Sequence, residues 1–160
     1  MIEQKNVLPT LEKPLGPASG IAAPSRGDKT EFGLEVAVVF TSVEATVAAL
    51  KRAGILASRL NGRIALLVPQ LVPYPLPLES PPVLLDFNER RFRVIASECL
   101  VETSVRIYLC RDPLETLTAV LAPRSLVVIG GPKRWWPTRE KSLTRKLRHA
   151  GHEVIFAETE

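Results

Sequence analysis

One short stretch of this chain contains residues that could bind an anion: Gly130-Gly131-Pro132-Lys133-Arg134. An unbroken apolar run precedes the two glycines, which predicts a strand buried on both faces. We expect the glycines to turn the backbone sharply and the proline to end the strand. Thr138 can then cap a helix, whose first N–H groups and the two cations would converge on a phosphate-sized group. The stretch therefore predicts an anion site at the end of a strand.

The same region is strongly basic. Between Lys133 and Arg148 there are seven Lys and Arg residues and one acid, Glu140, although the whole chain has a net charge of only +4. Such a patch could attract phosphate, nucleic acid or an acidic protein, and a solvated helix face is the simpler interpretation. Trp135 and Trp136 stand at its start, where one ring could anchor a protein partner. For each ring by itself we favour packing over the end of the sheet.

No set of residues has the pattern of a catalytic or metal site. His149 and His152 have no carboxylate or cysteine placed to complete a metal site, and we expect them near a helix C-terminus and at the surface, respectively. Ser42 and Ser142 have no evident base partner, and no Gly-x-Ser-x-Gly turn is present. We therefore expect neither catalysis nor a bound metal.

The 160 residues suffice for one domain with a substantial core. Residues 1–33 mix Pro, Gly, Ser and balanced charges without periodicity. We expect them to form a flexible leader before a domain spanning 34–160, with docking of the leader as an alternative. Cys99 and Cys110 fit neither a metal spacing nor a disulfide framework, which favours a reducing compartment. With no signal peptide and no run that could cross a bilayer, we expect a soluble cytoplasmic protein with no membrane partner.

Five apolar or alternating runs predict strands, at 34–40, 64–68, 105–110, 126–129 and 153–157. The segments between them predict helices that begin near Thr41, Asp86, Asp112 and Thr138, each of which can accept a hydrogen bond from the first turn. A proline-rich segment, 69–82, should form a stiff link.

The alternation of strands and helices predicts a parallel α/β sheet with helices on both faces. Right-handed crossovers allow the strand order 3-2-1-4-5, which puts the two most apolar strands, 34–40 and 126–129, side by side. The third strand, 105–110, alternates with a period of two, so we expect it to be half buried and to lie at a sheet edge. The predicted anion site then opens where the two central strands end.

Residues 34–158 resemble the universal stress protein family, small five-stranded Rossmann-like α/β domains of which some members bind adenine nucleotides. The resemblance rests on Val36 to Ser42 with the Ala-rich helix after it, on Arg124 to Gly130, and on the closing strand. It implies that ATP or AMP, if bound, lies at the ends of strands 1 and 4. The family's acid at the end of strand 1 is replaced by Phe40, and only Ser42 of that turn matches.

The phosphate loop that the resemblance implies after strand 4 is also incomplete. Gly130 matches its first position and Thr144 its last, whereas Lys133 and Leu143 replace two intervening glycines. A side chain at position 133 would crowd a backbone that should wrap a phosphate closely. The candidate residues for a nucleotide or another anion are therefore Ser42, Gly130, Gly131, Lys133, Arg134 and Thr144.

Three functions follow from these observations. The resemblance, with its degenerate nucleotide motif, favours a non-catalytic sensing or interaction module that forms a homodimer through the last strand. The alternative is a stress protein that still binds ATP, AMP or another anion at the loop after strand 4. Nucleic-acid binding through the basic last helix and the neighbouring tryptophans is a lesser alternative, since no recognised motif supports it.

Overall fold

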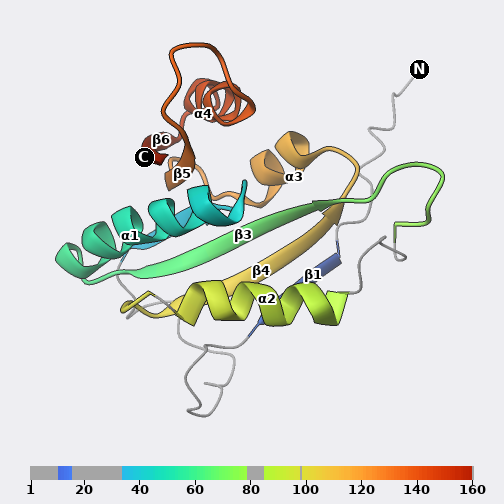
Figure 1. Ribbon diagram of the computed structural model, residues 1–160, viewed down its shortest axis with the longest axis horizontal. Helices are drawn as coiled ribbons and strands as arrows, with labels where there is room; N and C mark the ends of the chain where they lie inside the picture. The colour runs from blue at the N-terminus through green and yellow to red at the C-terminus, as the bar shows by residue number, and fades with distance from the viewer. Residues whose placement is uncertain (1–10, 16–33, 79–84, 98, 160) are drawn as a thin grey trace.

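The structure, a computed structural model, describes residues 11–15, 34–78, 85–97 and 99–159. These residues form one sheet of six strands with helices on both faces (Figure 1). The strands are β1 (Leu11–Leu15), β2 (Glu35–Val39), β3 (Arg63–Leu71), β4 (Thr103–Cys110), β5 (Leu126–Pro132) and β6 (Glu153–Thr159). The helices are α1 (Val43–Arg59), α2 (Leu85–Ser97), α3 (Pro113–Val120) and α4 (Arg139–His149).

The strands from β2 to β6 are parallel and lie in the order β4-β3-β2-β5-β6, which confirms the predicted order 3-2-1-4-5. β2 and β5 are neighbours at the centre, with Val36 opposite Leu126 and Val39 opposite Ile129. Their carboxyl ends therefore meet at the same edge of the sheet, where the anion site was expected.

The central strands are buried on both faces because each face carries its own pair of helices. Val36 and Val38 pack on the side of α1 and α2, whereas Ala37 and Val39 pack on the side of α3 and α4. α1 lies close to β2 and β5 because the residues it buries against the sheet are mostly small: Ala45, Thr46, Ala49, Leu50, Ala53 and Ala57. No helix in the described ranges combines the length and apolarity needed to cross a bilayer.

β4 differs from the prediction in two respects. It does not lie at the sheet edge, because β1 pairs with it in the antiparallel direction, with Leu11 opposite Leu109. It is also more than half buried, since Tyr108 and Cys110, on the face expected to be exposed, are covered. The period-two pattern gave a wrong prediction of burial because Tyr and Cys, unlike the neighbouring Arg106, can be buried at little cost in free energy.

β1 lies within the segment predicted to be a flexible leader. For its five residues the docking alternative describes the structure better, because they add a strand to the sheet. The remainder of that segment, 1–10 and 16–33, lies outside the described residues.

All four helices begin within two residues of the predicted starts, and two of the four predicted capping residues are correct. Asp112 and Thr138 cap α3 and α4 as expected. α1 is capped by Ser42 instead of Thr41. Asp86 lies inside α2, which already begins at Leu85 and ends at Ser97.

The proline-rich segment is strand at its start. β3 continues through Pro69 and stays paired with β4. The following residues are held by Arg111, whose guanidinium donates to the carbonyls of Val72 and Leu76 at 2.6 and 2.7 Å and lies 4.1 Å from the ring centre of Tyr74. Residues 79–82 of the predicted link lie outside the described residues.

Candidate functional site at the carboxyl ends of β2 and β5

The candidate site lies at the corner where β2 and β5 end beside each other. The Thr41 hydroxyl donates to the Gly130 carbonyl at 3.0 Å, and the Thr41 N–H donates to the Thr46 hydroxyl at 3.3 Å. Ser42 begins α1, where its hydroxyl accepts from the Ala45 N–H at 3.3 Å. The structure thus brings together two of the predicted site residues, Ser42 and Gly130. Their polar groups are already engaged with the protein itself.

Gly130 and Gly131 do not form the predicted turn. Both continue β5, which pairs with β6 as far as Pro132. A Cβ on Gly130 would lie 1.8 Å from the Ala45 carbonyl oxygen, so glycine is needed there because the first turn of α1 packs directly on the strand. A Cβ on Gly131 would lie 2.6 Å from the Phe156 ring. The two glycines therefore allow close packing and do not open a phosphate cradle.

Phe40 closes the other side of this corner. Its ring meets that of Phe92, on α2, edge to face, with the centroids 4.7 Å apart and the planes at 74°. Both rings belong to the apolar cluster between the sheet and the helices α1 and α2. A carboxylate at position 40, which the resemblance implies for nucleotide binders, would lose this ring contact and lie partly buried against an apolar cluster.

The remaining predicted site residues lie after the strand. Lys133 and Arg134 are exposed, and the Arg134 guanidinium lies 5.5 Å from the ring centre of Trp136. Thr144 is only 4% exposed, and its hydroxyl donates to the Glu140 carbonyl at 2.9 Å within α4. Thr144 is therefore part of the helix packing and does not offer its hydroxyl to a phosphate.

The N-terminus of α4 was predicted from the sequence to bind an anion. In the structure, a capping hydroxyl and a carboxylate of this chain already interact with it. Thr138 accepts from the Lys141 N–H at 3.3 Å, so the cap satisfies one of the free donors. Glu140 places a carboxylate in the first turn, where it interacts favourably with the helix dipole and repels a second anion.

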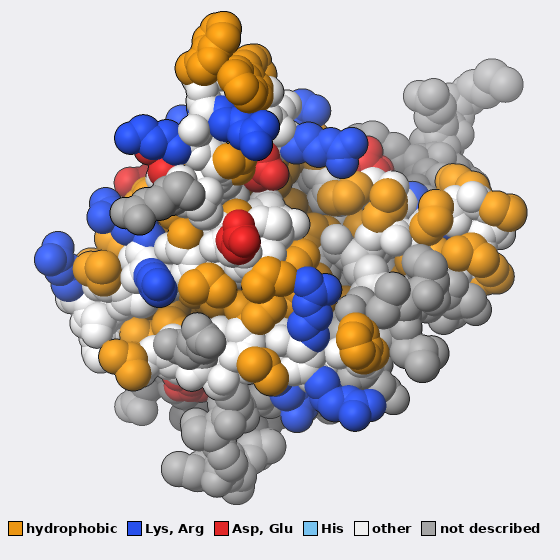
Figure 2. All heavy atoms as spheres, in the orientation of Figure 1, with side chains coloured by type: hydrophobic (Ala, Val, Ile, Leu, Met, Phe, Trp, Pro, Cys, Tyr) orange, Lys and Arg blue, Asp and Glu red, His pale blue; other side chains and the backbone are white. Residues whose placement is uncertain are grey.

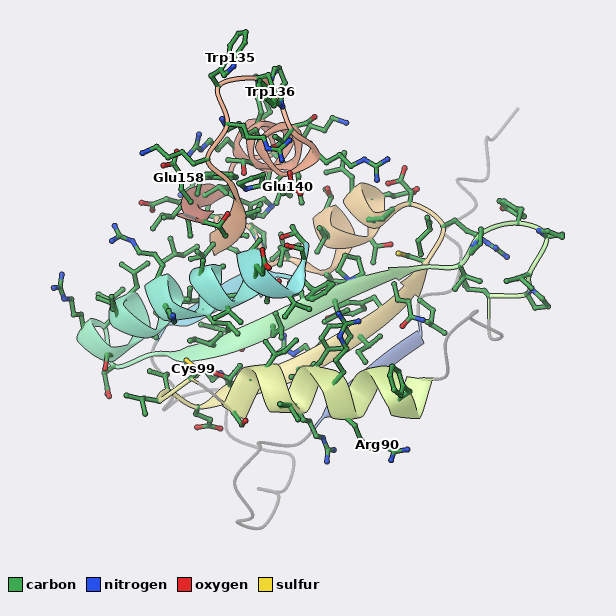
Figure 3. All side chains as sticks on the ribbon, in the orientation of Figure 1. Arg90, Cys99, Trp135, Trp136, Glu140 and Glu158 are labelled. Atoms are coloured by element: carbon green, nitrogen blue, oxygen red, sulfur yellow. The ribbon has the colours of Figure 1, made fainter. Side chains whose placement is uncertain are left out.

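The two tryptophans are not packed over the sheet as predicted. Trp135 is 90% exposed and Trp136 is 45% exposed, at the outer end of the loop between β5 and α4 (Figure 3). The sheet beneath is already covered by Phe156, packed over Gly131, and by Leu147. Because the covering residues belong to β6 and α4, the sequence around the tryptophans does not show that the sheet is already covered.

Two hollows of the described part of the molecule lie away from this corner. One, of about 530 Å³, lies between α1 and the residues after α2 and is mainly apolar. The other, of about 390 Å³, lies at the amino ends of β2 and β5, beside Glu35. Glu35 accepts from Arg63 at 3.0 Å and from Arg106 at 3.1 and 3.2 Å, which links three strands. Neither hollow is lined by a predicted site residue.

Two titratable side chains of the described residues that could do chemistry, His152 and Cys110, are buried. No three His, Cys, Asp or Glu side chains among those residues are placed to hold a metal ion. His152 is buried, not at the surface as expected, and its Nδ1 accepts from the Ser125 N–H at 3.2 Å. Burial raises the pKa of the Cys110 thiol; a hydrogen bond with Thr116 opposes this rise, and the nearby Asp112 charge adds to it. This thiol is therefore kept protonated and unreactive.

One contact that was not predicted from the sequence lies at the outer edge of β6, the last strand of the sheet. The Glu153 N–H donates to the Ser125 carbonyl at 3.0 Å, on the β5 side, so the next carbonyl along the strand, that of Val154, faces outward. The Arg148 guanidinium donates to this carbonyl at 2.8 and 3.2 Å. In the sequence, Arg148 is one of many basic residues and nothing distinguishes it.

Comparisons with known proteins identify the fold. No protein-family model and no curated protein matches this sequence. A solved structure of a universal stress protein in complex with cAMP is similar with a TM-score of 0.52, over 81% of this chain and 100% of that chain, at 16% sequence identity. This likeness confirms the universal stress protein fold that the resemblance implied.

Proposed function

We propose that this chain is a non-catalytic interaction module with a universal stress protein fold, and that it forms a homodimer through the outer edge of β6. The observation that carries the proposal is the position of β6 at the end of the sheet, where β5 is the only described strand that pairs with it. An unpaired strand edge offers a row of N–H and C=O groups to a second strand. A twofold pairing of two β6 strands would be self-complementary and antiparallel.

The usable part of this edge is short. Backbone groups alternate in direction along a parallel strand, so those of Phe156 and Glu158 face outward together with those of Val154. The Val154 carbonyl is already occupied by Arg148. Pairing would therefore centre on Phe156 to Glu158, and Arg148 would keep the strand from pairing over its full length.

The alternative function, nucleotide binding, draws support from the neighbour that holds cAMP. Several contacts of this chain argue against it: the pairing of Phe40 with Phe92, the close packing of Ala45 on Gly130, and the burial of Thr144. We propose that neither ATP nor AMP is required for folding or pairing. The free cysteines, Cys99 and Cys110, support a reducing, cytoplasmic location.

The test is the molar mass of the full chain, measured by light scattering during size-exclusion chromatography over a range of concentrations. The wild type should form a dimer. Glu158→Pro removes one outward N–H from each copy and should weaken pairing about 5-fold to 160-fold, from about 0.5–1.5 kcal/mol for each of the two lost hydrogen bonds. Glu158→Ala keeps the N–H and should pair like the wild type.

A second variant tests the same edge by a change that should strengthen the pairing. Arg148→Met frees the Val154 carbonyl and should strengthen self-association. A wild-type protein that is monomeric at every concentration would contradict the proposal. So would equal pairing of Glu158→Pro and Glu158→Ala, provided that both unfold at the same temperature.

A further inference from the structure

Trp135 and Trp136 form a projecting aromatic tip, which we call the Trp tip. It stands at the end of the loop between β5 and α4, beyond the rest of this part of the molecule (Figures 2 and 3). The rings touch edge to face, with centroids 5.6 Å apart and planes at 74°. With 90% of Trp135 exposed, the tip presents one of the largest apolar side chains to water, a feature typical of interaction sites.

Two contacts restrain the loop that carries the Trp tip. The Arg134 guanidinium lies 5.5 Å from the ring centre of Trp136, within the range of a cation–π contact. The Lys141 ammonium, on α4, donates to the Arg134 carbonyl and so ties the base of the loop to the helix. These contacts reduce the conformational entropy that the loop backbone would lose on binding.

Cations surround the base of the tip. Figure 2 shows Lys and Arg side chains, with fewer Asp and Glu side chains among them, beneath the two rings. The basic residues of the loop and helix are Lys133, Arg134, Arg139, Lys141, Arg145, Lys146 and Arg148. The partner that fits this surface is therefore apolar at its centre and negatively charged around it.

Single-stranded nucleic acid and an anionic lipid bilayer both combine apolar and anionic groups, and the ring geometry favours the bilayer. Base stacking uses open ring faces along a basic groove. Here the planes cross at 74°, Arg134 lies over Trp136, and the surface is convex. A convex tip of Trp rings with cations behind it suits the interface of a bilayer, where indole rings sit at headgroup level and cations meet anionic lipids.

We propose that the Trp tip and the basic residues beside it bind the surface of a membrane that contains anionic lipids. This differs from the expectation of no membrane partner, which rested on the lack of a spanning segment. Binding at the interface requires no such segment. The proposal goes beyond pairing through β6 and does not depend on it.

The chain offers a specific probe, because Trp135 and Trp136 are its only tryptophans. Tryptophan emission of the full chain is recorded with vesicles of phosphatidylcholine and phosphatidylserine, and with vesicles of phosphatidylcholine alone. We expect a shift to shorter wavelength with the anionic vesicles only, and quenching by lipids brominated on their acyl chains. Co-sedimentation with the same vesicles gives the affinity.

Three variants make the test specific. Trp135→Ala should weaken binding at least about tenfold, since the larger exposed apolar surface of the tip is lost. Arg134→Gln should weaken it about fivefold, as expected for one cation near an anionic surface. Phe87→Ala removes another aromatic side chain, 60% exposed on α2, and should bind like the wild type.

Unchanged emission with the anionic vesicles, or equal affinity of Trp135→Ala and the wild type, would overturn the proposal. A single-stranded oligonucleotide that quenches the emission, with no binding to vesicles, would overturn it too and assign the tip to nucleic acid. None of these results bears on the β6 edge, which the molar mass tests separately.

Discussion

The packing of α1 on β5 can be tested by adding one carbon atom. In Gly130→Ala the new Cβ would lie 1.8 Å from the Ala45 carbonyl oxygen and 2.5 Å from its carbon, whereas Cβ atoms essentially never approach other heavy atoms within 3.0 Å. These are backbone atoms, so no side-chain rotation relieves the clash. The first turn of α1 must move away from the strand, which also disturbs the hydrogen bond from Thr41 to the Gly130 carbonyl.

The expected loss of stability is large. Overpacking a well-packed core costs about 1–3 kcal/mol, and a weakened hydrogen bond adds about 1 kcal/mol. We therefore expect Gly130→Ala to lower the free energy of unfolding by about 3 kcal/mol. For a chain of this size, that corresponds to a fall in melting temperature of about 6–12 °C.

Gly54→Ala is the matched control. It lies within α1, and its Cβ would meet only the Cys99 sulfur, at an ordinary distance of 3.4 Å. Alanine favours a helix over glycine by about 0.5–1 kcal/mol, so this variant should be slightly more stable than the wild type. Urea unfolding of the three proteins gives both values. If Gly130→Ala were as stable as the wild type, Gly130 would lie in an open turn and the closed corner would be refuted.

Three further predictions concern single side chains. In urea unfolding, Phe40→Ala should lower the free energy of unfolding by about 2–3 kcal/mol. This is less than the loss expected for a fully buried ring, because Phe40 is only partly buried. His152→Leu should cost about 1–3 kcal/mol in the same assay, because the Ser125 N–H loses its acceptor; equal stability would exclude that hydrogen bond. With a thiol reagent at pH 8, Cys110 should react far more slowly than Cys99. Because burial raises the pKa of the Cys110 thiol, its reaction rate should rise only at a pH above the ordinary pKa range of a thiol. Equal rates for the two cysteines would contradict this.

The sheet could be predicted from the sequence because its signals are local. Val36 to Val39 and Leu126 to Ile129 are continuous apolar runs of strand length, and capping residues such as Asp112 mark helix starts. Alternation of strands and helices then leaves few topologies, since crossovers are right-handed. These rules allow the order 3-2-1-4-5, which places the two most apolar strands at the centre, and the structure has that order.

The candidate site could not be predicted in the same way, because distant residues decide what each side chain does. Two adjacent glycines suit a turn as well as close packing, and only the position of Ala45, far away in the sequence, shows that packing applies at Gly130. The exposure of Trp135 likewise depends on Phe156, which already covers the sheet end on that side. The role of Arg148 depends on the direction of one carbonyl of β6.

The central claim is that the chain keeps a universal stress protein fold while the corner between β2 and β5 is closed to nucleotides. It is tested most directly by thermal melting with ATP, AMP and cAMP, with inorganic tripolyphosphate as the control, at low and moderate salt. A ligand that binds the folded state must raise the melting temperature. We predict that no nucleotide raises it more than tripolyphosphate does, and that salt abolishes any rise, because only exposed cations are involved. A nucleotide-specific rise that persists at moderate salt would contradict the claim.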